Sequence, residues 1–301
     1  MTDRGGAPAP EGLAKLPVGP AVIQSFDLVW MNRRSLAPWL AAAVALYAVS
    51  SAIFFYGGTA DFTDVPLVVR YVLLGTGIFG FIAVAGCLLV AIIIAHRCVL
   101  LADEKLLKHG RPSWRVIVRY GGHAILIMLL PSLCAAFAAV FWFSLVGNVV
   151  AGHPVFSGVA LIIYFLAVVW AAIWIVAHLC LVLPAKASDV PGFGLGNAWR
   201  AAKGNALRMA VGGFLVSLPF MPWFFEITRK VQGVQTVRTE YVFRGVLGEP
   251  LARLGMPDLS LSILSFSIDA VAIVCVAAFL SHAFQVLRHN NLPELANPEA
   301  E

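Results

Sequence analysis

Six long apolar stretches follow one another along the chain, and shorter segments that hold most of the charged residues separate them. Each stretch is continuously apolar rather than alternating, and a helix needs about 20 apolar residues to cross a bilayer. Continuous runs favour helices over a barrel. The pattern therefore predicts an all-α integral membrane protein with transmembrane helices at 36–56, 71–101, 123–146, 158–183, 207–227 and 260–287.

Composition agrees with this prediction, because 60% of the residues are apolar and only 12% are charged. Soluble domains carry about 25% charged residues. The net charge of +5 does not indicate a nucleic-acid partner, since no basic stripe is interleaved with exposed aromatic residues. The cysteines lie in or beside apolar runs and are odd in number, so we expect apolar packing rather than disulfides: Cys87, Cys98, Cys134, Cys180 and Cys275.

The distribution of lysine and arginine predicts the orientation of the helices. Most of these residues fall in the N-terminal segment, in the second and fourth loops and in the C-terminal tail. Basic residues remain preferentially on the cytoplasmic side of a membrane. We therefore expect cytoplasmic termini, with a disordered tail at 1–20 and a second tail at 289–301 flanking a membrane domain at 21–288.

The fifth loop is also basic, although it falls on the opposite side. Its cations are nearly balanced by carboxylates, and apolar residues recur at helical spacing between Ile227 and Val246. This pattern predicts an amphipathic helix on the outer membrane surface, and a solvated loop is the alternative.

A threefold repeat is suggested by similar segments at the ends of even-numbered spans. His96, His178 and His282 occupy the same place in these segments, each after a small residue. Ser113-Trp114-Arg115 and Ala198-Trp199-Arg200 precede spans three and five. We predict three repeats, at about 21–107, 108–190 and 191–288, each a cytoplasmic amphipathic surface helix followed by a transmembrane hairpin.

The three equivalent histidines are a candidate cluster if the repeats surround one axis. Three imidazoles suit zinc or another borderline metal, and they also suit a pH-sensitive group. Alternatively, each histidine caps a helix C-terminus, where the helix dipole favours positive charge. The metal is unknown, and we expect no other cofactor.

Asp269 is the one carboxylate well inside a predicted span. An ionisable residue in the membrane is costly and indicates a functional site, here one that binds a cation or relays a proton. The alternative is a shorter span, which would place Asp269 at the hydrated outer interface.

Motifs typical of hydrolases, redox enzymes and ATPases are absent from the sequence, including HExxH, GxSxG and paired CxxC. The glycine-rich stretch at 191–196 lacks the Lys-Ser/Thr ending of a phosphate loop. We therefore expect no enzymatic activity of these classes. Pro131, Pro219 and Pro222 predict kinks, and the glycines of span two predict close helix contact.

The segment from Leu183 to Ala187, followed by Gly196-Asn197-Ala198-Trp199-Arg200 and Gly204-Asn205, carries a family resemblance. It resembles the multi-pass membrane domain associated with some bacterial glycerophosphodiester phosphodiesterases. The resemblance implies a protein of the bacterial cytoplasmic (inner) membrane. It implies no catalytic residue, because the phosphodiesterase activity of such relatives resides in a separate soluble barrel.

These observations lead to three functional hypotheses. The first is a non-enzymatic accessory or scaffold protein that binds anionic lipid, a membrane-protein partner or a second copy of itself. Its headgroup contacts would be Arg115, Arg119, Arg200, Lys203 and Arg208. The second is a transporter or channel for a small solute, ion or proton that uses Asp269. The third is an intramembrane metalloenzyme built on the three histidines.

Overall fold

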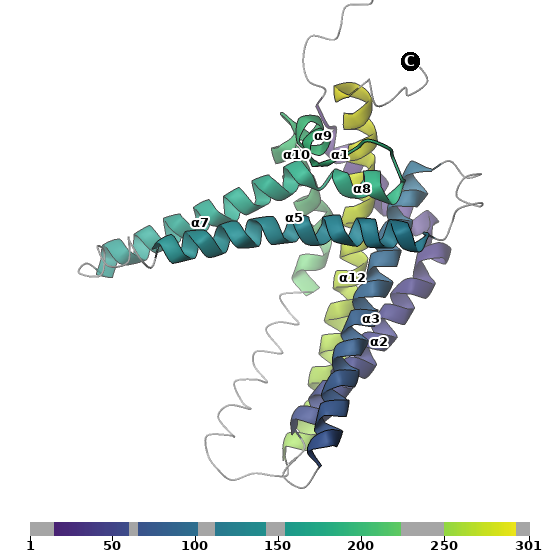
Figure 1. Cartoon of the computed structure of the whole chain (residues 1–301), viewed down its shortest axis with the longest axis vertical. Helices are drawn as coiled ribbons and strands as arrows, with labels where there is room; N and C mark the ends of the chain where they lie inside the picture. Colours follow the sequence, from purple (N-terminus) through teal and green to yellow (C-terminus); the bar gives the residue numbers. More distant parts are fainter. Residues whose placement is uncertain (1–14, 60–65, 102–111, 143–153, 224–249, 293–301) are drawn as a thin grey trace, which may run out of the picture. The chain divides into compact units, whose positions relative to one another are not determined.

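The computed structural model describes residues 15–59, 66–101, 112–142, 154–223 and 250–292, and all regular structure in these ranges is helical (Figure 1). The predicted amphipathic helix of the fifth loop lies outside the described residues. The helices are α1 (Val18–Met31), α2 (Arg33–Thr59), α3 (Leu67–Leu100), α5 (Trp114–Phe141), α7 (Pro154–Leu179), α8 (Val182–Ala187), α9 (Leu195–Ala202), α10 (Ala206–Ser217), the 3-10 helix η3 (Leu218–Phe220) and α12 (Pro250–Asn291).

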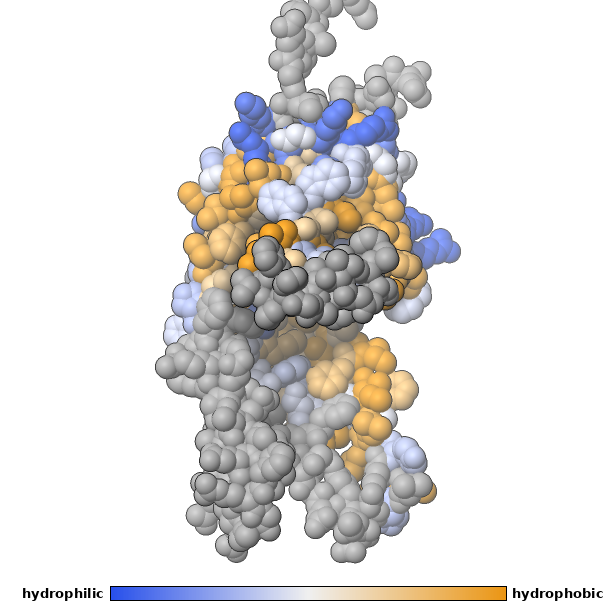
Figure 2. Space-filling view, turned by 90° about the vertical axis from the view of Figure 1, so that its left-hand side faces the viewer, coloured by the Kyte–Doolittle hydropathy of each residue, from blue (hydrophilic) through white to orange (hydrophobic). Residues whose placement is uncertain are grey.

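Six helical segments of the described chain are long and apolar enough to cross a membrane, which confirms the predicted number of spans. They are Arg33–Ile53, Tyr71–Leu100, Trp114–Val140, Ile162–Ala187, Ala206–Trp223 and Ser262–His289. Large apolar side chains are widely exposed on them, and Figure 2 shows such residues as extended orange areas. Phe79 and Phe137, for example, are 74% and 73% exposed. Such exposure is expected where lipid replaces water.

Helix boundaries differ from the prediction at three places. Trp114 and Arg115 form the first turn of the span helix α5 itself, and the helix continues through Gly121 and Gly122 into the apolar run that follows. Helix α12 begins at Pro250, within the predicted fifth loop. Helix α7 ends at Leu179, and the short helix α8 then completes the apolar run of span four.

The prolines act on these helices in different ways. Pro131 lies inside α5, and Pro38 lies inside α2. Pro219 belongs to η3, where the chain changes from α-helix to 3-10 helix in the middle of span five. Proline cannot donate the backbone hydrogen bond of an α-helix, so a local change of winding is its expected effect.

The chain divides into two compact units. The first comprises 1–23, 113–213 and 279–301, and the second comprises 24–112 and 214–278. Within the second unit, α2 and α3 pack side by side (Figure 1). Within the first unit, α5 contacts α7 and α8, and α9 contacts α7. Neither unit coincides with one of the three predicted repeats, so the repeat stays a prediction.

Glycine allows the close approach of α2 and α3 at one point. A Cβ atom on Gly80 would collide with the Ser50 side chain, which is buried. The same atom on Gly75 or Gly86 would meet open space. The predicted role of small residues in helix contact therefore holds at Gly80 and not at the other two positions.

An aromatic group joins α2, α3 and the second-unit part of α12. The ring of Tyr47 stacks on Phe266 with centroids 4.2 Å apart and meets the edge of Phe81 at 5.9 Å. The Tyr47 hydroxyl also lies 2.8 Å from Ser262 Oγ, so the two hydroxyls are hydrogen-bonded. These contacts fix the three helices at one level of the second unit.

Candidate functional site

Helix α9 begins after an ordered glycine-rich corner. Gly192 has φ +69°, a left-handed conformation that glycine adopts without strain. Asn197 Nδ2 donates to the Gly192 carbonyl at 3.0 Å, and the buried Phe193 ring meets Phe284 edge-on with centroids 5.1 Å apart. Contacts on both sides thus hold this corner in place, and α9, which follows it, packs against the first unit.

One face of α9 is buried and the other is exposed. Ala198, Ala201 and Ala202 face the interior, whereas Trp199 and Arg200 are exposed. Small alanines allow this helix to lie closely on its neighbours. The described helix α9 therefore exposes a tryptophan and an arginine, and its place on a membrane surface stays a prediction.

A cluster of three mutually contacting rings attaches α9 to α7. His178, near the end of α7, lies 4.2 Å from Trp174 and 4.3 Å from Trp199, and the two tryptophans meet edge-on at 4.9 Å, all measured between ring centroids. Its Nδ1 lies 2.9 Å from the Trp174 carbonyl oxygen, so the hydrogen-bonded tautomer carries its proton on Nδ1. The imidazole is thus held by two ring contacts and by one hydrogen bond at Nδ1.

The five predicted headgroup contacts all lie in the first unit. Arg115, Arg119, Arg200 and Lys203 are exposed, and Arg208 is half-buried. Arg119 pairs with Asp189 at 3.0 Å, and Arg200 donates to the Asn197 side chain. An exposed ion pair of this kind contributes little to stability. The guanidinium of Arg119 therefore remains available at the surface.

Charge in the described part of the first unit is strongly one-sided. Its described residues include eight lysines and arginines, and Asp189 is the single carboxylate among them. The five predicted contacts are joined by Lys15, Lys186 and Arg288. Arg115, Lys186 and Arg288 lie at the ends of candidate spans, so the described part of this unit carries basic residues at the ends of its helices.

The N-terminal segment is tied to the turn between α9 and α10. The N–H of Leu16 donates to Asn205 Oδ1 at 2.8 Å, and Arg208 Nη1 donates to the Leu16 carbonyl at 3.0 Å. The Leu16 side chain is fully buried. The sequence did not predict this contact, because no local pattern links residues so far apart along the chain.

The three candidate histidines belong to different units. His96 lies in the second unit and is fully buried, whereas His178 and His282 lie in the first. Within the described residues of either unit, no three histidine, cysteine or carboxylate side chains are grouped as a metal site requires. A meeting of all three histidines stays a prediction.

Asp269 lies in the second unit, seven residues after the start of the span Ser262–His289. This corresponds to about 10 Å along the helix. The side chain is half-buried and has no hydrogen-bond or ion-pair partner among the described residues. Ser267 Oγ donates to the Ile263 carbonyl at 2.7 Å, so this nearby hydroxyl serves its own helix.

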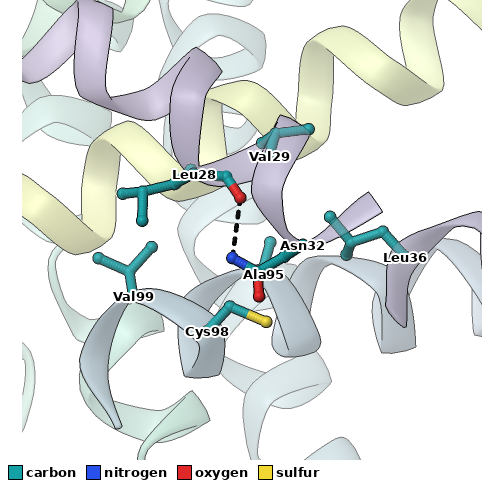
Figure 3. Close-up of a pocket in the computed structure, with 8 residues that line it drawn as sticks. Leu28, Val29, Asn32, Leu36, Ala95, Cys98 and Val99 are labelled. Carbon is teal, nitrogen blue, oxygen red and sulfur yellow. Dashed lines mark hydrogen bonds between the residues drawn. The ribbon is translucent and has the colours of Figure 1, made fainter. Parts of the chain in front are cut away.

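A small pocket in the second unit lies between the α1–α2 corner and the end of α3 (Figure 3). Its lining is almost entirely apolar, and Asn32 Nδ2 donates to the Leu28 carbonyl at 2.8 Å. No space remains for a water molecule. The pocket is therefore a packing defect between helices rather than a ligand site.

No family model, curated protein or solved structure matches this chain.

Proposed function

We propose that this protein is a non-enzymatic membrane protein of accessory or scaffold type, which binds anionic lipid headgroups through the basic surface of its first unit. The observation that carries the proposal is the imbalance of charge, eight cations against one carboxylate in the described part of that unit. The carboxylate is already paired with Arg119. An anionic headgroup would pair with the cations that Asp189 does not neutralise.

The position of these cations favours lipid over a soluble anion. Lys203 lies three residues before the span Ala206–Trp223, and Arg115 lies in the first turn of the span Trp114–Val140. Headgroups lie at the ends of spans, where each basic residue contributes about 1 kcal/mol to the attraction of an anionic surface. The exposed Trp199 is typical of the same interfacial layer.

The orientation belongs to the same proposal. The lysine and arginine distribution supports cytoplasmic termini, and the family resemblance supports the bacterial inner membrane. Three hairpins, each preceded by an amphipathic helix on the cytoplasmic surface, would put the basic surface of the first unit against the inner leaflet. The arrangement of α9 before α10 supports this for the third hairpin.

The test measures lipid bound to purified protein by native mass spectrometry, with phosphatidylglycerol and phosphatidylcholine offered in equal amounts. We expect a preference for phosphatidylglycerol. Combined replacement of Arg115, Arg200 and Lys203 by alanine should lower it by on the order of a hundredfold, which corresponds to about 3 kcal/mol. Replacement of Arg70, Arg244 and Arg253, which the topology puts on the opposite side, removes equal charge and is the control. Equal losses in both variants would contradict the proposal.

A second candidate function is transport of a cation or proton past Asp269. The observation that favours it is that the Asp269 carboxylate is half-buried inside a span. This carboxylate has no hydrogen-bond or ion-pair partner among the described residues. Flux into proteoliposomes tests it, with Asp269→Asn as the variant that keeps the shape of the side chain. Transport through this residue predicts flux in the unmodified protein and its loss in the variant, and flux that the variant retains would exclude it.

A further inference from the structure

The docked N-terminal segment adds a cation to the turn between α9 and α10. Side chains from this turn bind both backbone polar groups of Leu16, through Asn205 and Arg208. Lys15 directly precedes Leu16 and is exposed, and Lys203 lies two residues before Asn205 and is also exposed. The two hydrogen bonds therefore bring the backbone next to Lys15 to the segment that carries Lys203 and Arg208, almost two hundred residues further along the chain.

These cations have no described counter-ion. Asp189 is the one carboxylate in the described part of the first unit, and it is paired with Arg119. Lys15 and Lys203 have no hydrogen-bond or ion-pair partner among the described residues, and Arg208 uses one N–H group on Leu16. The remaining N–H groups of Arg208 are those that bind phosphate oxygens well, because a guanidinium presents paired donors in one plane.

We propose that Lys15, Lys203 and Arg208 form one site for the phosphodiester headgroup of an anionic phospholipid, and that docking of Leu16 assembles it. This inference rests on the proposed function and names one of its sites. Arg208 has two roles in it, since the guanidinium both holds the Leu16 carbonyl and faces the headgroup. The N-terminal segment is then an integral part of the lipid-binding surface and not a passive tail.

Three single variants test the site by native mass spectrometry, with phosphatidylglycerol and phosphatidylcholine as the competing probes. Lys15→Ala should lower the phosphatidylglycerol preference about fivefold, the effect of one basic residue at a membrane surface. Lys15→Arg should retain the preference. Leu16→Gly should lower it to a similar extent without any change of charge, because the buried side chain that holds Lys15 in place is lost.

Arg70→Ala removes one positive charge that lies outside the proposed site, and it should leave the preference for phosphatidylglycerol unchanged. Thermal melting confirms that each variant is folded, and Lys15→Ala alters only an exposed side chain. An unchanged preference in Lys15→Ala, together with a loss in the Arg115, Arg200 and Lys203 variant, would overturn this inference and leave the proposed function standing. Absence of any preference in the unmodified protein would remove both.

Two further outcomes are informative. A higher preference after Leu16→Gly would mean that the N-terminal segment covers the cations rather than completing the site, and would overturn the inference. An excess of inorganic phosphate should not displace phosphatidylglycerol, because the acyl chains also contribute to binding. Displacement by phosphate alone would show that the site takes a soluble anion, against the assignment to lipid.

Discussion

Leu16 and Asn205 are 189 residues apart in the chain, yet the backbone N–H of Leu16 donates to Asn205 Oδ1 at 2.8 Å. Asn205 is 1% exposed and Leu16 is fully buried, so water cannot replace the bond. A buried donor without an acceptor costs about 1–3 kcal/mol. The contact therefore makes the Gly204-Asn205 pair a structural element of the first unit.

Asn205→Ala should destabilise the protein by about 1–3 kcal/mol, because it leaves the Leu16 N–H buried and unsatisfied. Thermal unfolding in detergent measures this effect. Asn197→Ala is the matched control, since Asn197 makes its hydrogen bond to Gly192 at an exposed position. The control should change stability by less than about 0.5 kcal/mol. Equal effects of the two variants would show that the Leu16 contact does not hold the N-terminal segment.

Gly212 and Gly213 are neighbours in α10 with different surroundings. A Cβ atom on Gly212 would overlap the buried Phe279 ring, whereas one on Gly213 would meet nothing. Gly212→Ala should cost about 1–3 kcal/mol through overpacking. Gly213→Ala should be neutral or stabilising, because alanine favours the helix over glycine. Melting temperatures of the two variants in the same detergent check this, and a harmless Gly212→Ala would show that the Phe279 ring can move aside.

Tyr47 is predicted to couple to Ser262 through their hydroxyl groups, which lie 2.8 Å apart. Hydrogen bonds between membrane helices contribute about 0.6 kcal/mol on average in double-mutant cycles. A cycle of Tyr47→Phe and Ser262→Ala should give a coupling of this size. Tyr47→Ala should cost more than Tyr47→Phe, because it also removes the stack on Phe266. Strict additivity in the cycle would contradict the hydrogen bond.

The spans could be predicted from the sequence because the bilayer imposes a length and a composition on each one separately. The helix boundaries were predicted less well where polar and apolar residues are mixed. Trp114 and Arg115 are polar enough to indicate a surface segment, yet α5 continues through them. Helix formation requires only local hydrogen bonds, and nothing at these positions interrupts them.

Contacts between distant segments could not be predicted in the same way. Four glycines in span two were equivalent in the sequence, and Gly80 differs from Gly75 and Gly86 because it faces Ser50. Likewise, the sequence predicted a tail at 1–20 that includes Lys15, whereas in the structure the neighbouring Leu16 is hydrogen-bonded to Asn205. Such contacts depend on how helices pack on one another, and the periodicity of a single segment cannot predict them.

The repeat pattern identified His178 as a candidate ligand. In the structure its ring contacts both Trp174 and Trp199, which also contact each other, and its Nδ1 faces the Trp174 carbonyl. Contacts between aromatic rings contribute about 0.5–1.5 kcal/mol each. His178→Ala loses both contacts and should destabilise the protein by about 1–3 kcal/mol.

His178→Phe separates packing from ligation, because phenylalanine keeps an aromatic ring in contact with the two tryptophans and cannot bind a metal. If packing is the role of His178, the phenylalanine variant should retain most of the stability that the alanine variant loses. It should be less stable than the unmodified protein by about 0.5–1.5 kcal/mol, because the hydrogen bond is missing. Thermal melting and elemental analysis of the same samples decide the matter. A bound metal in the unmodified protein that disappears in His178→Phe, with stability lost as in His178→Ala, would instead make this histidine a ligand.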